Sequence, residues 1–375
     1  MQKPQKETRT PIRTLGRAKE LSLKSPKPRS KGLTNKKKTL IVLGVLFGIG
    51  ILSYLLFFLN KNDSSVLISP TTLTSKAQSG QKTYSPLSGS EVTEEQANRA
   101  LTALIIENSV DARPQSGLTE AGVIYEAIAE GGITRFAAIY QENTPQEIGP
   151  VRSLRPYFLD WLRPFDPTVA HVGGSKKALA QVRDGTWKDI DQFANGKSFW
   201  RSKERKAPHN VYTSFENIDA FNKSKEYVLE EFTQFPRKDD QPTNSLTATT
   251  INMNISSKPY NSSLTYNSTN NSYLRFQGGA AHLDKSGKQI EPKVVIALIS
   301  SYSIVQEDGS RSAYKTIGSG EAIVFQDGTA TPATWTKADQ KAQLKLTDPS
   351  GSEIKLNRGQ TWFTVLSSRD KLSYR

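Results

Sequence analysis

The chain has 375 residues, a formal net charge of +14 and no cysteine. Its length allows a membrane anchor and about two domains. The missing cysteine excludes disulfides, thiolate nucleophiles and cysteine-bound metals, and leaves no lipidated cysteine as an anchor. Residues 1–38 contribute +11 of the charge, so the rest of the chain is close to neutral at +3. Nucleic-acid-binding proteins usually carry a basic face on the folded domain, so we expect no nucleic-acid partner.

Residues 39–59 form an uncharged apolar run of 21 residues. At about 1.5 Å per residue, a helix of this length matches a hydrocarbon core about 30 Å thick. The run is longer than the apolar part of a signal peptide and is followed by no small-residue cleavage site. It predicts a single transmembrane helix.

The basic residues before this run predict its orientation. Lys36, Lys37 and Lys38 precede the run and only Lys61 follows closely, which places the N-terminus in the cytoplasm and the rest of the chain outside. Residues 1–38 lack aromatic side chains and are rich in Lys, Pro, Ser and Thr, so we expect a disordered cytoplasmic tail. Residues 60–97 are polar and predict a linker.

Residues 98–240 alternate strand and helix signals, which favours a layered, sandwich-like α/β domain. Helical spacing after Thr119 predicts a helix that ends at Gly131, and a second helix is expected after Pro150. Ser175 is expected to begin a third helix. Short apolar runs predict strands at 101–107, 133–140 and 168–172.

Residues 241–375 predict a smaller, β-rich domain. Its first part, up to about 275, is rich in Asn, Ser and Thr and contains either a domain boundary or a solvated meander. A core strand is expected at 294–299, and Asp327-Gly328 and residues 348–351 are turn signals.

Two arginines in the first domain suggest a ligand. Arg152 and Arg155 are three apart on the expected second helix and would share a face. Arginine suits bidentate contact with carboxylate or phosphate, and a Gly-Gly-Ser turn before a helix presents backbone N–H groups. An anionic ligand at the edge of a sheet is one interpretation. The other is an internal ion-pair network with Glu126, Glu130, Asp160 or Asp166.

The predicted ligand-binding residues cluster around glycine-rich turns, where loops often carry function. His171 and His209 suit general acid–base chemistry, although a structural role is the alternative for each. A zinc site would need carboxylates or the remote His282, so we expect no metal and no cofactor. No catalytic residue is assigned. The predicted site comprises Glu126, Arg135, Arg152, Arg155, His171, Ser175, His209 and Asn210.

Four motifs carry a family resemblance. The strings ARPQSGLTEAGVIYEAIAEGGITRF, IGPVRSLRPYFLDW, HVGGS and APHNVYTS occur in this order, and GSGEAIVFQDGTATPATWTK and LNRGQTWFTVL follow. Together they resemble the YerB-like lipoproteins of bacteria over about residues 98–370. The resemblance implies two extracytoplasmic domains of unknown function and no particular activity. Here the spanning helix would replace the lipid anchor.

Three functions are compatible with these observations. The first is a cell-envelope binding or accessory protein with an Arg/His-lined site for an anionic or carbohydrate ligand. The second is an envelope enzyme that acts on a phosphorylated or glycan substrate. The third is a structural scaffold whose arginines are satisfied by internal carboxylates.

Overall fold

The computed structural model describes residues 82–306 and 309–375. The predicted tail, the predicted transmembrane helix at 39–59 and the first part of the predicted linker lie outside these residues. Within the described ranges, no helix is both long enough and apolar enough to cross a membrane.

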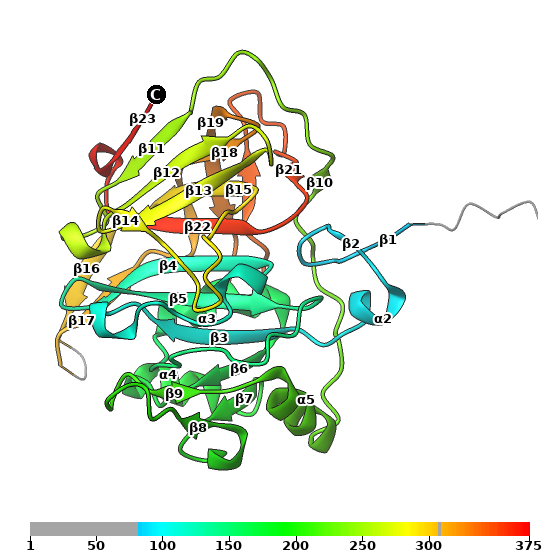
Figure 1. Ribbon diagram of the computed structural model, residues 1–375, viewed down its shortest axis with the longest axis vertical. Helices are drawn as coiled ribbons and strands as arrows, with labels where there is room; N and C mark the ends of the chain where they lie inside the picture. The colour runs from blue at the N-terminus through cyan, green and yellow to red at the C-terminus, as the bar shows by residue number, and fades with distance from the viewer. Residues whose placement is uncertain (1–81, 307–308) are drawn as a thin grey trace, which may run out of the picture. The chain divides into compact units, whose positions relative to one another are not determined.

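A mixed sheet of ten strands runs through the described part of the chain (Figure 1). Strands from the predicted first domain form one half of it, strands from the predicted second domain form the other, and β22 and β4 join the halves in parallel. In spatial order the strands are β20 (Lys345–Thr347), β19 (Thr329–Lys337), β18 (Gly318–Gln326), β15 (Val294–Ile299), β22 (Thr361–Leu366), β4 (Val123–Glu130), β5 (Ile133–Tyr140), β3 (Thr102–Glu107), β6 (Thr168–His171) and β7 (Lys188–Asp191).

The remaining strands form smaller sheets. A five-stranded antiparallel sheet contains β14 (Ala280–Ala281), β13 (Ser272–Gln277), β12 (Ser262–Asn267), β11 (Thr250–Met253) and β23 (Leu372–Tyr374). Two-stranded pairs are β1 (Thr83–Tyr84) with β2 (Glu91–Val92), β8 (Trp200–Arg201) with β9 (Val211–Tyr212), β10 (Arg237–Lys238) with β21 (Leu356–Asn357), and β16 (Tyr302–Val305) with β17 (Arg311–Tyr314). The α-helices of the described residues are α2 (Glu94–Ala97), α3 (Pro156–Leu162), α4 (Lys176–Val182) and α5 (Phe215–Ser224).

The sheet is buried on both faces. On the β4 side, Tyr125 packs in one apolar cluster with Phe158 of α3, and the neighbouring Ile124 packs in another with Phe215 of α5. On the other half, the five-stranded sheet packs against β15 and β18 through a third cluster. The described fold is therefore mostly β with few helices, and the α/β expectation holds only for the layers around β3, β6 and β7.

Several predicted elements are confirmed. Strand β5 spans 133–140 and β15 spans 294–299, as expected, and Ser175 is the N-cap of α4. The Asn/Ser/Thr-rich stretch forms the antiparallel meander of β11, β12 and β13.

The predicted helix after Thr119 is wrong, because residues 123–130 form strand β4. A strand buried on both faces has a continuous apolar sequence, and such a run also satisfies helical spacing. Gly131 and Gly132 have φ values of +56° and +80° and form the two-residue hairpin turn to β5, instead of a helix C-terminus. Two consecutive positive φ values favour glycine in this type of turn.

The second predicted helix begins later than expected. Its first residue is Pro156, and Arg155 is the extended N-cap with φ −132° and ψ 150°. Proline disfavours the helical conformation in the residue before it and is well tolerated as a first helical residue. Arg152 and Arg155 therefore precede the helix and do not share a helical face.

The end of the predicted linker is folded. Residues 82–97 form β1, β2 and α2, and Ser85 and Ser88 are buried. Ser85 donates a hydrogen bond to Glu142 at 2.9 Å, and Ser88 also bonds to that carboxylate. Serines that looked like solvated linker residues are instead internal hydrogen-bond donors.

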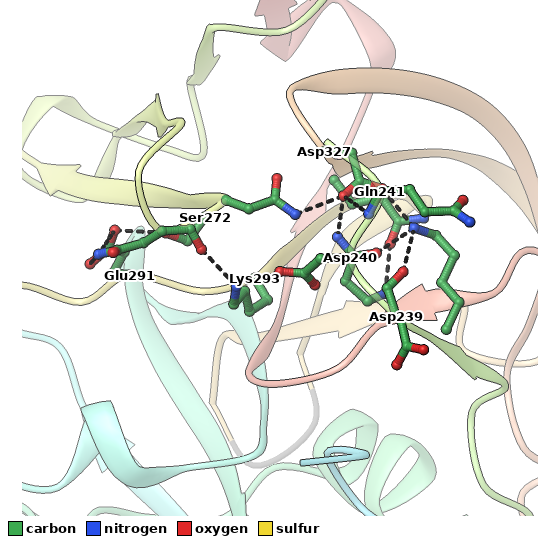
Figure 2. Close-up of polar contacts among 12 residues, drawn as sticks. Asp239, Asp240, Gln241, Ser272, Glu291, Lys293 and Asp327 are labelled. Atoms are coloured by element: carbon green, nitrogen blue, oxygen red, sulfur yellow. Dashed lines mark hydrogen bonds and ion pairs between the residues drawn. The ribbon is translucent and has the colours of Figure 1, made fainter. Parts of the chain in front are cut away.

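A second carboxylate, that of Asp327, binds the segment that connects the two halves. Figure 2 shows Asp327, in the β18–β19 turn, where its Oδ1 accepts hydrogen bonds from the Gln241 N–H (3.1 Å), Asn271 (2.8 Å) and Asn357 (2.7 Å). Its Oδ2 pairs with Lys238 at 2.6 Å. Burial alone would raise the pKa of Asp327, but these donors hold it below its usual value.

A fully buried ion pair lies at the junction of the halves. Glu126 of β4 pairs with Arg275 of β13 at 2.8 Å, and both side chains are 0% exposed. The same carboxylate accepts hydrogen bonds from Trp362 (3.2 Å) and Thr134 (3.2 Å). Arg275 also contacts the ring of His282, and burial with the nearby Arg275 charge lowers the pKa of that imidazole well below its usual value.

We predict that Arg275→Ala lowers the free energy of unfolding by about 3–5 kcal/mol, because it leaves the Glu126 carboxylate buried without a counter-charge. Adding Glu126→Gln should recover part of this loss. Urea unfolding followed by tryptophan fluorescence measures both. The control Arg369→Ala breaks a partly exposed pair with Glu321 and should cost less than about 1 kcal/mol. A loss from Arg275→Ala as small as the control's would contradict this role.

Candidate functional site

Three parallel strands end at the same edge of the large sheet. Strand β3 pairs in parallel with β6, and β6 pairs in parallel with β7. Their last residues are Glu107, His171 and Asp191. In sheets of this kind, ligands typically bind beyond the carboxyl ends of the strands.

The segment 150–154 crosses this edge and is held on both sides by main-chain hydrogen bonds. The Arg152 N–H donates to the carbonyl of Ile105 at 2.7 Å, and the Leu154 N–H donates to that of Gly173 at 2.9 Å. A β-carbon on Gly174 would lie 3.1 Å from the Leu154 carbonyl oxygen, so glycine permits the close approach. The segment and the loop after β6 therefore form one fixed surface.

A depression of about 480 Å³ lies at this surface. Three arginines line it, and none of its lining residues is acidic. The lining residues are Arg152, Ser153, Val172, Gly173, Gly174, Leu179, Arg183, Phe193, Arg201, Pro208 and Val211.

Asp191 holds one side of the depression together. Its carboxylate accepts the Gly173 N–H at 2.9 Å and the Phe193 N–H at 3.2 Å, and it pairs with Arg183 at 2.6 Å. The residue is 1% exposed. Burial would raise its pKa, but these donors and the neighbouring His171 lower it below the usual value. The Asp191 carboxylate thus orders the loop that contains Gly173, the turn that contains Phe193, and the lining residue Arg183.

Glu107 has the same role on the other side. It is buried, and its Oε1 lies 3.2 Å from Nε of Arg152 and 2.9 Å from Nδ1 of His209. Ser109 donates a hydrogen bond to the same oxygen at 2.9 Å. The carboxylate therefore orients a second lining arginine and one face of the His209 ring.

The third lining arginine has a neutral partner. Arg201 donates to the side-chain oxygen of Asn210 at 2.8 Å and, in the part of the chain that the structure describes, to no carboxylate. Asn210 in turn donates to the Ser202 carbonyl at 3.1 Å. The positive charge of Arg201 is therefore not neutralised by a direct ion pair.

Two of the predicted site residues form a separate cluster. Arg135 pairs with Glu130 at 2.7 Å and donates to the Ser153 carbonyl at 2.8 Å. Arg155 pairs with the same glutamate. Burial lowers the pKa of Arg135 to about 10, so it remains charged at neutral pH. These arginines satisfy an internal carboxylate, which is what the ion-pair interpretation expected of them.

The predicted residues are thus distributed over several groups, and only Arg152 lines the depression. His171 is fully buried, with Nε2 2.8 Å from Asp189 and Nδ1 2.8 Å from the Gly173 carbonyl. Ser175 caps α4, and Glu126 belongs to the junction described above.

Among the described residues, no group of three or more His, Asp or Glu side chains could hold a metal ion.

Residues that the sequence did not single out complete the site. Arg183, Arg201 and Phe193 line the depression, and Glu107 and Asp191 hold it. Glu107 ends an apolar strand and could have been recognised from that position, whereas Asp191 ends the mostly polar strand KDID and could not. Arg201 ends strand β8 and Phe193 lies in the turn after β7, and neither position carries a local sequence signal of ligand binding.

Comparison with known proteins gives a consistent family assignment. Residues 87–228 match the model of the protein of unknown function (DUF3048) N-terminal domain, and residues 251–363 match that of its C-terminal domain. The chain is similar to the protein named "Putative lipoprotein YerB" of Bacillus subtilis (strain 168), with 30% identity over 298 residues, 78% of this chain and 89% of that protein.

A solved structure agrees with this assignment. The crystal structure of the YerB protein from Bacillus subtilis superposes with a TM-score of 0.71 at 27% identity, covering 78% of this chain and all of that one. The two matched models also fit the two-part layout expected from the sequence.

Asp191→Asn should lower the free energy of unfolding at pH 7 by about 1.5–3 kcal/mol, the range for hydrogen bonds to a charged group. Because the folded-state pKa of Asp191 is depressed, its contribution is present above the unfolded pKa of about 3.9 and is lost as the pH falls through the folded pKa. The difference in urea midpoint between wild type and variant should therefore be smaller at pH 3 than at pH 7. Asp239→Asn, at an exposed site, is the control. A gap that stays constant down to pH 3 would show that the charge is not responsible.

Proposed function

Because the chain belongs to the DUF3048 family of proteins of unknown function, we propose its role from the site itself: it is a membrane-anchored, extracytoplasmic accessory protein that binds an anionic ligand in the three-arginine depression. The depression is open enough, at about 480 Å³, for a ligand with more than one charged group.

Two observations support the location. The similar protein from Bacillus subtilis carries the name "Putative lipoprotein YerB", and a lipoprotein is attached to a membrane. This chain has no cysteine to carry a lipid, but it has the apolar run at 39–59. A spanning helix there would leave the described residues outside the cytoplasm.

The main support for an anionic ligand is the positive charge of the residues that line the depression. Arg152, Arg183 and Arg201 line one depression, and no lining residue is acidic. Each guanidinium has five N–H donors. Asp191 accepts from one N–H group of Arg183 and Asn210 from one of Arg201, and Glu107 contacts Arg152 as an ion pair at 3.2 Å. The buried partners hold the arginines in place before a ligand arrives, which lowers the entropic cost of binding. A preorganised set of arginine donors suits a carboxylate or phosphate.

We expect Arg201→Gln to weaken binding of inorganic pyrophosphate about tenfold, the effect of losing one charge-assisted contact. Arg201 is the best choice because its partner is neutral, so the substitution leaves no buried carboxylate unpaired. Isothermal titration calorimetry at low and high salt measures the loss, and binding should weaken with salt. The matched control Arg369→Gln lies on the C-terminal half and should bind as wild type does. Equal affinities for wild type and Arg201→Gln would contradict the proposed site.

A second candidate function is an envelope enzyme that acts on a phosphorylated or glycan substrate. His209 favours it, because Glu107 and Ser109 both contact Nδ1 and the ring is partly exposed. In the described residues, Nε2 has no hydrogen-bond partner. A carboxylate on one ring nitrogen orients a histidine whose other nitrogen can move a proton.

If the chain is an enzyme, His209→Ala should reduce its turnover of p-nitrophenyl phosphate or p-nitrophenyl glycosides by about 10²–10⁴-fold. The Michaelis constant should change little, since the arginines that would hold the substrate remain. Release of p-nitrophenol measures the rate, and Arg369→Gln again serves as the control. No turnover by the wild-type chain on either substrate class would count against this candidate and leave the binding proposal intact.

A further inference from the structure

One apolar side chain in the depression is exposed without a structural reason. Phe193 is 73% exposed and is the only aromatic residue among those lining the depression. Leaving a phenylalanine in water forgoes about 1.5–3 kcal/mol of burial free energy. A ring at this position therefore suggests contact with something outside the described chain.

The turn that carries the ring is fixed. The N–H groups of Ala194 and Asn195 donate to the Asp191 carbonyl at 3.0 and 2.8 Å, and the Phe193 N–H donates to the Asp191 carboxylate at 3.2 Å. The ring lies against Gly173, because a β-carbon there would come within 3.0 Å of the ring atom Cε2. The ring is thus presented at a defined place beside the arginines.

The combination of ring and arginines narrows the ligand. A cation would suit the ring but would be repelled by Arg152, Arg183 and Arg201. A small inorganic anion would suit the arginines but would make no use of the ring. A ligand that uses both needs negative charge together with an apolar face.

We infer that the depression takes a saccharide bearing carboxylate or phosphate groups, with one face of a sugar ring stacked on Phe193 and the charged groups on the arginines. This inference rests on the proposed anion site and adds the substrate class. A sugar ring presents C–H groups on its face and hydroxyls at its edge. Apart from the arginines, Ser153 is the only lining residue with a polar side chain, so the arginine N–H groups would be the main donors to both the charged groups and the hydroxyls.

The test uses the full chain and three probes: trigalacturonate, its neutral methyl ester, and inorganic pyrophosphate. Phe193→Ala should weaken trigalacturonate binding about three- to tenfold, the size of an aromatic contact, and leave pyrophosphate binding unchanged. Arg201→Gln should weaken both anionic probes. The methyl ester should bind more weakly than trigalacturonate to the wild-type chain. Phe193→Trp should retain trigalacturonate affinity, and its fluorescence should change on binding.

The outcomes separate this inference from the proposed function. Unchanged trigalacturonate binding in Phe193→Ala, with a loss in Arg201→Gln, overturns the saccharide inference and leaves the anion site standing. Equal losses of both anionic probes in Phe193→Ala overturn it as well, because the ring would then only support the loop. No effect from either variant overturns both proposals. Tighter binding of AMP than of trigalacturonate, lost in Phe193→Ala, would assign the ring to a nucleotide base instead.

Discussion

The parallel pairing of β4 with β22 is the contact on which the rest of the structure depends. It joins strands that lie more than 200 residues apart into one sheet, and it places Glu126 between donors from both halves. A carboxylate with no solvent exposure is tolerated only when it is paired and hydrogen-bonded. Since Arg275 and Trp362 come from the C-terminal half, the halves cannot separate without leaving this charge unpaired. The N-terminal half therefore depends on the C-terminal half for the partners of its buried carboxylate.

Buried carboxylates also pair with arginines in the candidate site at the edge of the sheet. Glu107 and Asp191 end two parallel strands, are buried, and each holds one arginine that lines the depression. Their negative charges make it possible to keep cationic side chains close together, while the unused N–H donors remain available to a ligand. Asn210 accepts a hydrogen bond from Arg201 and so orients it without neutralising its charge. The result is a preorganised positive surface built on strand ends, with one exposed ring beside it.

Local sequence predicted the elements whose signals are local. Strand β5, strand β15 and the Ser175 cap follow from apolar runs and a capping residue. Strand β4 was misread as a helix because burial on both faces removes the alternation that identifies a strand. For the site, the edge location and Arg152 were predictable, but the partners of each arginine were not. Glu107 and Arg152 lie 45 residues apart, and Arg201 meets Asn210 only through the β8–β9 pair.

The central claim is that this one depression is the binding surface, and backbone NMR mapping tests it most directly. Titrating the isotope-labelled chain with trigalacturonate should shift the amide signals of Gly173, Gly174, Phe193 and Arg201 together, with a single dissociation constant. The amides of the β16–β17 hairpin, which borders a different depression, should not move. Shifts confined to that hairpin, or spread evenly over the basic residues of the described chain, would contradict the account.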